Sequence, residues 1–513
     1  FGGINPAGRS SFHHNYRRLV IDALPEDKAA RTYQSLAALM GVDAANRQHI
    51  LDHTLIRKIE AQYFDTNAVP CNKKMRVAST DSPIRYVTKA RNLPEMVPSN
   101  WVITPLANGD VDVQISGVAE MLVPSTKVFE VSSAGQIPTG FDPGKLYASR
   151  SHPRGLEMGI YAASDMLGAT GISWQEITNV VPPEQISVFA SSGMAQLDDN
   201  GLGGLLSARA NGKKATSKQL ALGLAEMPAD FINAYVLGSA GTTGGNLGAC
   251  ATFLYNLMQG VNDIKAGRSR VALIGAAEAA ICPGGMEGYI AMGALGTDAN
   301  LMALDGTDTV DNRRASRPFS DNCGFTIGEA ANFVMLMDDE LALEMGATIH
   351  GAVTDVFVNA DGHKKSISSP GVGNYLTVAR ATAAARAIVG EKAMRHRSFV
   401  QAHGTSTPQN RTTESHILNE VAKAFGIEKW PVAAIKAYIG HTVASASADQ
   451  LISSLGVWSE GIIPGIKTIT PIADDVHQSN LALQAEHHEV GVDGMDVAIL
   501  NAKGFGGNNA SAC

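Results

Sequence analysis

The sequence has few cysteines, no long hydrophobic run and no surplus of positive charge. Its five cysteines, Cys71, Cys250, Cys282, Cys323 and Cys513, are irregularly spaced, which fits reduced thiols better than disulfides or a metal site. No apolar run reaches the roughly 18 residues that a membrane-spanning helix needs, and the first residues show no signal sequence. Because the formal net charge is -8, nucleic acid is a poor partner. These absences predict a cytoplasmic protein that binds neither membrane nor nucleic acid and holds no metal.

The residues that are present indicate a globular protein rich in tight turns. Hydrophobic residues make up 45% and charged residues 18% of the chain, with 52 glycines. At 513 residues the chain is long for one compact core. The length therefore predicts either roughly two to four domains or one large duplicated fold.

Hydrophobic periodicity divides the chain into two α/β halves and an insertion. Residues 14–62 have a mainly helical pattern, whereas WVITPLANGDVDVQISG alternates apolar and polar residues around an Asn-Gly-Asp turn. From about residue 150, strand-like runs alternate with helical runs, and the same rhythm returns late in the chain. We therefore expect an α/β fold with an N-terminal half over 1–330 and a C-terminal half over 331–513. The insertion, at about 63–145, is expected to form a cap or a small sheet layer.

Cys250 lies between the glycine-rich turn GTTGGNLGA and the helix-like run ATFLYNLMQGVNDIKAG. The peptide dipoles at a helix N-terminus favour a thiolate over a thiol. The neighbours Gly248, Ala249 and Ala251 are small enough for a sharp strand-to-helix turn and for the close approach of a substrate. A lone cysteine in an apolar helix is nevertheless more often a buried small side chain than a nucleophile. This stretch alone leaves both interpretations open.

Two histidines occupy similar settings. His403 ends the apolar run in SFVQAHGTST, and His441 follows AAIKAYIG and precedes a helical pattern. Loops at strand ends are where α/β folds place reactive side chains. Each histidine taken singly fits a structural role equally well. Three reactive residues, each after an apolar strand and beside a turn of small residues, indicate a catalytic site.

The motifs GACAT, AHGTST, IKAYIGHTVASASA and KGFGGNNAS, in this order, resemble those of the β-ketoacyl synthases with a Cys-His-His site. The stretches SSGMAQLDDNGLGG, AEMPADFINAY and RPFSDNCGFTIGEAANFVML agree with the same family. The resemblance covers about residues 1–45 and 150–513. It implies a thiolase-like fold, in which two related halves form a five-layer α-β-α-β-α sandwich, usually as a homodimer. It implies no bound cofactor, because the substrates carry phosphopantetheine or coenzyme A.

The resemblance also implies a decarboxylating condensation. Cys250 attacks an acyl thioester, from acetyl-CoA or an acyl carrier protein (ACP), and holds the acyl group as a new thioester. His403 and His441 assist the loss of CO2 from a malonyl thioester and stabilise the enolate oxygen. The backbone N–H groups of Cys250 and Phe505 match the oxyanion hole, and Phe505 also matches the gate that admits the acyl chain. The product is a β-ketoacyl thioester two carbons longer.

Five further positions match family residues around this site. Lys436 matches a lysine whose role is electrostatic and structural, and Glu329 and Glu414 match acids near that lysine. Thr405 and Thr407 match the threonines that hydrogen-bond the pantetheine arm of the malonyl carrier. The resemblance therefore implies that Glu329, Thr405 and Thr407 contribute to substrate binding.

Four positions depart from the family pattern. Arg411 stands where an aspartate is common, and Gln450 replaces the usual acid after the second histidine. Both changes remove negative charge near the lysine, so an ion site there does not carry over from the family. Lys503 replaces an aromatic residue. We expect its side chain to alter the gate, to reach the phosphate of the carrier or to extend to solvent. Met194 stands where glycine is typical, and it either narrows the acyl pocket as a substrate-binding residue or fills the core.

Charge predicts where the carrier docks. Acyl carrier proteins are acidic, and Lys213, Lys214 and Lys218 lie in a segment that resembles a docking region. The insertion and the opening GGINPAGRSSFHHNYRR resemble a longer subgroup of these synthases, from pseudomonads and relatives, that initiates fatty-acid synthesis from acetyl-CoA.

Two alternatives remain beside a condensing enzyme. A thiolase shares the fold but needs a second catalytic cysteine in a C-terminal glycine loop, whereas KGFGGNN contains none and Cys513 follows an alanine. A non-condensing synthase-like partner subunit typically loses the nucleophile, whereas this chain keeps Cys250, His403 and His441. Both comparisons favour the condensing enzyme.

Overall fold

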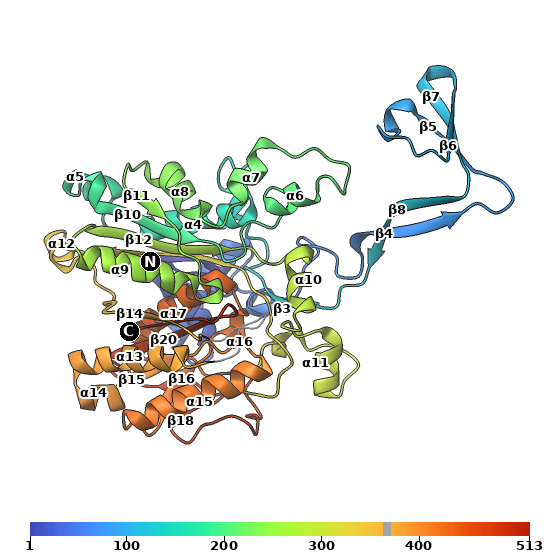
Figure 1. Ribbon diagram of the computed structural model, residues 1–513. Coiled ribbons are helices and arrows are strands. Elements are labelled where there is room, and N and C mark those ends of the chain that lie inside the picture. Colours follow the sequence, from blue (N-terminus) through green and yellow to red (C-terminus); the bar gives the residue numbers. More distant parts are fainter. Residues whose placement is uncertain (363–370) are drawn as a thin grey trace. The chain divides into compact units, whose positions relative to one another are not determined.

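The computed structural model describes residues 1–362 and 371–513. Its contacts divide the chain into two compact units, one of Phe1–Tyr63 with Glu130–Cys513 and one of Phe64–Phe129 (Figure 1). Within the described ranges, no single helix is long and apolar enough to cross a membrane. One pair, α7 (Ser217–Gly223) with the run Met227–Leu237, passes that test only as two segments bent by 104°.

The larger unit contains a first sheet in which the strands β10 and β12 are completely buried. The strand order is β11-β10-β12-β13-β1-β2, in which β10 is parallel to β11 and β12, and the remaining pairs are antiparallel. Continuous apolar runs such as ISVFA and VALIGAA suit strands that are covered on both faces. The strands are β1 (Gly2–Asn5), β2 (Gly8–Arg9), β10 (Ile186–Ser191), β11 (Thr242–Gly244), β12 (Val271–Glu278) and β13 (Ala330–Met337).

A second sheet repeats the same pattern of pairing. Its strand order is β14-β21-β20-β15-β16-β18, with β15 parallel to β16 and β20, and with β20, β21 and β14 successively antiparallel. The run β11-β10-β12-β13-β1 therefore corresponds to β16-β15-β20-β21-β14. The strands are β14 (Val356–Ala360), β15 (Ser398–Gln401), β16 (Trp430–Ala433), β18 (Leu481–Ala482), β20 (Val497–Gly504) and β21 (Asn508–Ala512).

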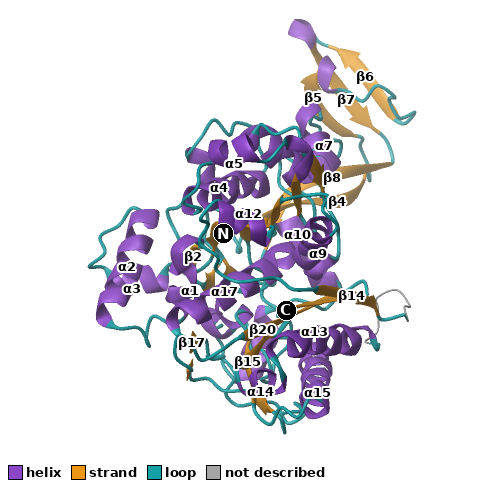
Figure 2. Cartoon of the chain, turned by 90° about the vertical axis from the view of Figure 1, so that its left-hand side faces the viewer, coloured by secondary structure: helices purple, strands orange, loops and turns teal. Residues whose placement is uncertain are grey.

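Helices separate and cover the two sheets. The helices α9 (Thr252–Lys265) and α17 (Ala446–Glu460) contact strands of both sheets and form the central layer. On the outer faces, α4 (Arg154–Ala169) and α8 (Met227–Ile232) pack on the first sheet, and α13 (Gly373–Val389) packs on the second (Figures 1 and 2). In Figure 2, α15 (Pro408–Ala424) lies beside α13. These layers confirm the predicted thiolase-like five-layer α-β-α-β-α sandwich.

The helical pattern expected over residues 14–62 corresponds to three helices, α1 (His14–Leu19), α2 (Glu26–Met40) and α3 (Arg47–Asp52). In α2 the residues Tyr33, Leu36, Ala37 and Met40 are buried at helical spacing, and Gly41 ends the helix in a left-handed conformation. The other helices of the larger unit include α5 (Trp174–Val180), α6 (Leu202–Ser207), α10 (Pro283–Ala291), α11 (Asp298–Asp305), α12 (Asp339–Glu344), α14 (Glu391–His396) and α16 (Lys436–Ile439).

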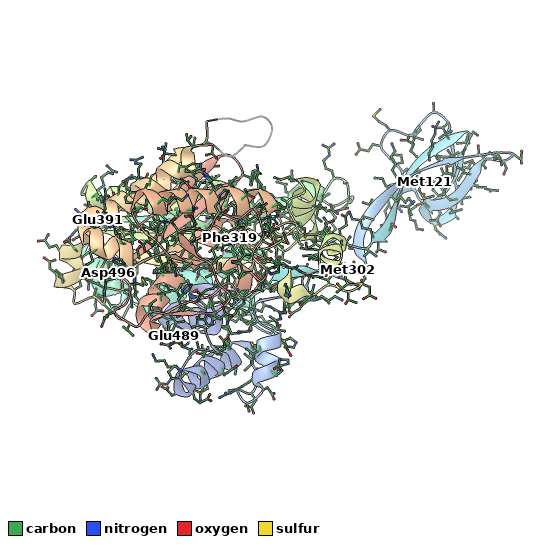
Figure 3. All side chains as sticks on the ribbon, turned by 90° about the horizontal axis from the view of Figure 1, so that it is seen from below. Met121, Met302, Phe319, Glu391, Glu489 and Asp496 are labelled. Atoms are coloured by element: carbon green, nitrogen blue, oxygen red, sulfur yellow. The ribbon has the colours of Figure 1, made fainter. Side chains whose placement is uncertain are left out.

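The first sheet extends past residue 330, where we expected the two halves to meet. Strand β13 (Ala330–Met337) pairs with β1 and β12, so the residues that follow position 330 still belong to the first sheet. Interior side chains such as Phe319, labelled in Figure 3, are almost completely buried in the larger unit.

The unit of residues 64–129 is shorter than the expected insertion of 63–145. Its boundaries are narrower because β3 (Ile56–Lys58) and β9 (Ser133–Gly135), on either side of it, pair with each other in the larger unit. It contains a ribbon of β4 (Val69–Ala78) and β8 (Val118–Lys127) and a sheet of β5 (Ile84–Lys89), β7 (Asp110–Ile115) and β6 (Trp101–Pro105). Its small core gathers around Val111, Val113 and Ile115, and Met121 packs against it (Figure 3).

Candidate active site

Cys250 lies in the turn that connects β11 to α9. It occupies the 3-10 turn Ala249–Ala251 and is 8% exposed. Ala249 adopts a left-handed conformation, with φ 49, which makes the turn sharp. Gly248 is required for packing, because a Cβ at this position would lie 2.6 Å from the ring of Tyr255. The structure thus presents Cys250 at the start of a helix, as the sequence predicts.

The electrostatic surroundings of Cys250 differ from the expectation of a thiolate. Burial raises the pKa of the Cys250 thiol to about 12, and Glu278 also raises it, although Lys436 and the backbone N–H groups of Cys250 and Phe505 lower it. Loss of water therefore outweighs the helix N-terminus, and Cys250 rests as a thiol at neutral pH. The two N–H groups that face the sulfur are those that the family resemblance implies for an oxyanion hole.

His403 and His441 face each other in the same site. Their ring centroids are 5.4 Å apart and the rings are perpendicular, at 89°. The backbone N–H of Lys503 donates to Nδ1 of His403 at 3.4 Å, and that of Val443 donates to Nδ1 of His441 at 3.2 Å. Because Nδ1 accepts in each ring, the proton of a neutral imidazole lies on Nε2.

Both imidazoles are neutral in this environment. Burial and the nearby Lys436 hold the pKa of His403 and of His441 well below its usual range. Nε2 of His441 is buried, and within the described part of the chain it has no hydrogen-bond partner. The site therefore holds at least one buried N–H donor that is left for a substrate.

Lys436 and Glu414 hold the turn that carries His403. The buried ammonium of Lys436 donates to the backbone carbonyl of His403. Burial lowers the pKa of Lys436 to about 8, against the opposing effect of Glu414, Cys250 and Asp449. Glu414 accepts from the backbone N–H groups of His403 at 2.6 Å and of Gly404 at 2.8 Å, and from the side chains of Asn410 and Asn501. Four donors thus satisfy this buried carboxylate.

Glu329 lies in a different contact from the one expected. Its carboxylate is completely buried and accepts from Nε and Nη2 of Arg154 at 2.8 and 2.9 Å, and from the hydroxyl of Tyr63. The carboxylates that act on Lys436 are instead those of Glu414 and Asp449. These donors occupy the oxygens of Glu329 and indicate a structural role, and its expected contribution to substrate binding stays a prediction.

The residues Thr405, Thr407 and Phe505 lie on loops that follow strands of the second sheet. The hydroxyls of Thr405 and Thr407 are 3.1 Å apart, directly after the His403 turn. Thr407 also caps α15, because its hydroxyl accepts from the backbone N–H of Asn410 at 3.4 Å. The ring of Phe505 is half exposed, whereas its backbone N–H faces Cys250. The exposed ring therefore fits the gate that the family resemblance implies, which stays a prediction.

Met194 packs against a residue that the sequence analysis missed. The hydroxyl of Tyr289 donates to Sδ of Met194 at 3.0 Å. The ring of Tyr289 lies 5.1 Å from that of Phe325, which lies 5.2 Å from His441. Burial raises the pKa of Tyr289, and the nearby Cys250 adds to this effect. Tyr289 lies on α10 in a stretch without a motif, so only the fold reveals that it is near Cys250.

Arg411 and Lys503 have identifiable partners. Arg411 donates from Nε to Asp475 at 2.8 Å and lies 3.5 Å from Asp321, so acids from neighbouring loops balance its charge. The ammonium of Lys503 donates to the hydroxyl of Thr413 on α15 at 3.4 Å. Burial lowers the pKa of Lys503. The Lys503 side chain therefore lies against the protein and does not extend freely into solvent.

Gln450 connects the two strands that carry His403 and Phe505. Its amide donates to the backbone carbonyls of Ala402 at 2.8 Å and of Asn501 at 3.1 Å. The adjacent Asp449 retains a buried carboxylate, which accepts from the hydroxyl of Thr442 at 2.6 Å. Burial raises the pKa of Asp449 to about 6. A negative charge is thus kept near the lysine, one residue before the position where the family carries it.

The expected docking lysines lie on the surface. Lys213, Lys214 and Lys218 are exposed, in the loop before α7 and on α7 itself. Across residues 1–362 and 371–513, no group of three or more His, Cys, Asp or Glu side chains is placed to hold a metal ion.

Comparison with known proteins identifies the family. The model of the β-ketoacyl synthase N-terminal domain matches residues 152–342, and that of the C-terminal domain matches residues 350–470. The β-ketoacyl-[acyl-carrier-protein] synthase FabY of Pseudomonas aeruginosa is 52% identical over 534 residues, which cover 100% of this chain and 84% of that protein. The crystal structure of that ketosynthase superimposes with a TM-score of 0.98 and covers 100% of this chain and 83% of the other.

Two more distant relatives are also synthases by name. The 3-oxoacyl-[acyl-carrier-protein] synthase 2 of Vibrio cholerae is 29% identical over 267 residues, which cover 51% of this chain and 59% of the relative. The fatty acid synthase alpha subunit stcJ of Emericella nidulans is 27% identical over 440 residues, which cover 80% of this chain and 27% of the relative. The chain therefore belongs to the β-ketoacyl synthase family, whose members condense acyl groups in fatty-acid synthesis.

Proposed function

We propose that this protein joins a short acyl primer, an acetyl thioester in the first instance, to malonyl-ACP with loss of CO2. The observation that carries this proposal is the buried group of a cysteine thiol and two neutral histidines whose rings lie 5.4 Å apart. The name of the Pseudomonas relative supports a carrier-bound substrate. The product is a β-ketoacyl-ACP two carbons longer than the primer.

In the first step, the sulfur of Cys250 attacks the carbonyl carbon of the primer thioester. The backbone N–H groups of Cys250 and Phe505 face the sulfur and stabilise the oxyanion of the tetrahedral intermediate. The carbon–sulfur bond of the donor then breaks, and the thiol proton of Cys250 leaves with the departing thiol. The result is an acyl group held on Cys250.

In the second step, the malonyl thioester loses CO2. Nε2–H of His403 and of His441 donate to the thioester carbonyl oxygen, which becomes the enolate oxygen as the carboxylate carbon leaves. Neutral imidazoles suit this role, because each ring can donate its Nε2–H to the oxygen. The lowered pKa of each ring disfavours a second proton. The α-carbon then attacks the acyl carbonyl on Cys250, and collapse of that intermediate expels the Cys250 thiolate, which takes up a proton.

The packing of Met194 supports a short primer. Tyr289 donates a hydrogen bond of 3.0 Å to Met194, lies close enough to Cys250 to be affected by its thiol, and packs against Phe325, which in turn contacts His441. A long acyl chain would have to displace these side chains, which is costly in a closely packed interior. An acetyl group adds few atoms beyond the thioester and needs little displacement.

Acylation of Cys250 tests this function. Intact protein is incubated with acetyl-CoA or with acyl-ACPs of graded length, and the mass increase is measured. We expect acetyl-CoA to label Cys250, and Cys250→Ala to remain unlabelled under the same conditions. Labelling by long acyl-ACP only would contradict the acetyl primer, and the absence of labelling by every donor would contradict the condensing function.

We propose that the carrier docks on the exposed lysines Lys213, Lys214 and Lys218. Their positive charges complement an acidic carrier, and salt weakens such an encounter. The double variant Lys213→Glu with Lys214→Glu is expected to raise KM for malonyl-ACP about tenfold and to leave the acylation by acetyl-CoA unchanged. Lys392→Glu with Lys429→Glu gives the same charge change at another exposed position and is the control. An unchanged KM in the docking variant would exclude this surface.

We also propose a homodimer, as the family resemblance implies. Strand β11 (Thr242–Gly244) is an edge strand of the first sheet, and an edge strand can pair with a second chain. Light scattering at micromolar concentration is expected to give twice the mass of one chain. A mass of one chain would contradict the dimer.

A further inference from the structure

Glu278 is a buried carboxylate beside the condensing site that the mechanism above does not use. It is the last residue of β12, follows the apolar run VALIGAA and is 1% exposed. Burial raises its pKa to about 7, although several hydrogen bonds lower it. An isolated ionised carboxylate is strongly disfavoured in such a place, so its partners should explain why it is there.

The partners of Glu278 come from two loops that are distant in sequence. Oε1 accepts from the hydroxyl of Ser192 at 2.8 Å, and Oε2 accepts from the backbone N–H of Gly193 at 2.7 Å. Oε2 also accepts from the backbone N–H of Ala444 at 3.4 Å, and the backbone N–H of Met194 adds a further donor. Every partner is a donor, and a carboxylate can accept from all of them, whereas an amide has only one acceptor atom.

The contact with Ala444 fixes the turn that follows His441. Val443 has a φ of 47, which is unusual for a β-branched residue, and its backbone N–H donates to Nδ1 of His441. Such a conformation persists only where the surroundings hold it. Glu278, bonded to the next residue, provides such a constraint.

The three segments meet at Gly193. A Cβ at this glycine would lie 3.1 Å from Oε2 of Glu278, 3.3 Å from Cγ1 of Val443 and 3.4 Å from the carbonyl of Ala249, which precedes Cys250. The carboxylate, the His441 turn and the Cys250 turn are therefore packed against one position, and a shift in one is transmitted to the others.

We propose that Glu278 is a positioning residue of the condensing site, which holds the Val443–Ala444 turn against the Ser192–Met194 loop and thereby keeps the proton of His441 on Nε2. This inference rests on the role proposed above for His441. Glu278 does not touch the substrate; it acts through the backbone N–H of Val443.

The charge of Glu278 also affects the ionisation of the Cys250 thiol, which can be measured independently of decarboxylation. The charged group that opposes it there is Lys436, whereas His403 and His441 are neutral and Tyr289 and Cys282 are the other titratable groups near Glu278. An anion beside a thiol disfavours the thiolate. Removal of this anion should therefore let Cys250 ionise at a lower pH.

Glu278→Gln tests the proposal. It keeps the size of the side chain but removes the charge and one acceptor. In the absence of a primer, we expect the decarboxylation of malonyl-ACP to fall about 10- to 100-fold while KM for malonyl-ACP stays within about twofold, since a misaligned donor impairs the reaction more than binding. The pH dependence of Cys250 alkylation by iodoacetamide should shift downward by about one pH unit.

Glu460→Gln is the matched control. Glu460 is a buried glutamate at the end of α17, paired with Arg17 and Lys28, away from the condensing residues. We expect its variant to lower the melting temperature without a shift in the alkylation profile. The proposal is wrong if Glu278→Gln retains the wild-type decarboxylation rate, or if its alkylation profile stays in place as in the control.

Ser192→Ala keeps the test decisive if Glu278→Gln does not fold. It removes one donor to Oε1, together with the bond of the same hydroxyl to the carbonyl of Ala195, and leaves the backbone donors to Glu278 in place. We expect a two- to fivefold loss of decarboxylation, and an unchanged rate would overturn the proposal. A wild-type protein that does not decarboxylate malonyl-ACP would instead contradict the proposed function itself.

Discussion

The two sheets of the larger unit place different chemistry at corresponding positions. In the first, the turn after β11 carries Cys250 at the start of α9; in the second, the segment after β16 carries His441 before α17. The loop after β10 carries Met194, and the loop after β15 carries His403. The two sheets therefore share a backbone plan and differ in the side chains at the ends of their parallel strands.

In the mechanism proposed above, this difference divides the reaction between the halves. The first sheet would supply the acyl acceptor and the packed side chains beside it. The second supplies two neutral N–H donors, the lysine that supports the His403 turn, and the loop whose backbone N–H faces the sulfur. We therefore expect acyl transfer and decarboxylation to be separable by substitutions in one half at a time.

Removal of the Cys250 thiol is expected to have the largest effect on the reaction. Cys250→Ala should lower condensation at least about 1,000-fold, because no atom remains to hold the acyl group. The decarboxylation of malonyl-ACP should persist, since His403 and His441 are untouched. Condensation is followed by product mass, and Cys513→Ala, a second cysteine outside the site, is the control. Condensation at the wild-type rate in Cys250→Ala would refute the division.

Removal of the buried carboxylate of Glu414, which supports the His403 turn, is expected to have the next largest effect, on stability. Glu414→Ala should lower the free energy of unfolding by about 3 to 5 kcal/mol, because four donors lose their acceptor and Lys436 loses a nearby anion. Urea unfolding measures this change. Glu420→Ala, on the same helix but partly exposed and paired with Lys423, should leave stability almost unchanged. Equal stabilities of the two variants would contradict the importance of the buried network.

His441→Ala is expected to impair decarboxylation and to spare the acylation of Cys250, which is the opposite of the effect expected for Cys250→Ala. We expect condensation and decarboxylation to fall about 100- to 1,000-fold, since one donor to the enolate oxygen is lost. The acylation of Cys250 should change only a few-fold, because its N–H donors are intact. His416→Ala, a histidine bonded to Tyr375 on the surface helices, should leave both steps unchanged. A loss of acylation equal to the loss of decarboxylation would show that the two steps are not separable.

The pH dependence of Cys250 alkylation gives the smallest and most graded effect. Because the pKa of this thiol is raised to about 12, the thiolate fraction should rise with pH between pH 6 and 8, but by less than about tenfold per pH unit, since Glu278 ionises near pH 7 and its charge disfavours the thiolate. Above about pH 8, Lys436 loses its proton and no longer favours the thiolate, so the slope should become shallower. Peptide mass mapping follows the alkylation, and a plateau below pH 8 would show that the thiolate forms more easily than burial allows.

Much of the fold was predictable because its signals are local. Buried parallel strands appear as continuous apolar runs, and helices such as α2 appear as apolar residues at helical spacing. The order of the short motifs predicted Cys250, His403 and His441 as the catalytic residues through their resemblance to the family, and the structure places the two histidine rings 5.4 Å apart. The thiolase-like class and the family were predicted on this basis and are confirmed.

Other features of the site were not predictable because they depend on distant partners. Glu329 pairs with Arg154 and Tyr63, which are remote in sequence, and no spacing rule indicates this choice. Tyr289 and Glu278 lie in stretches without a recognisable motif, and only the packing of α10 and β12 brings them near Cys250. The boundaries of the insertion likewise depend on the pairing of β3 with β9.

The sequence by itself determined the candidate catalytic side chains and their strand-end positions, because residue type and hydrophobic periodicity are properties of short segments. Only the tertiary structure decided their protonation. Burial keeps Cys250 as a thiol and both histidines neutral, since the removal of water disfavours charge more strongly than one helix N-terminus or one lysine favours it. That burial arises only when the two halves pack together and enclose these side chains between their layers.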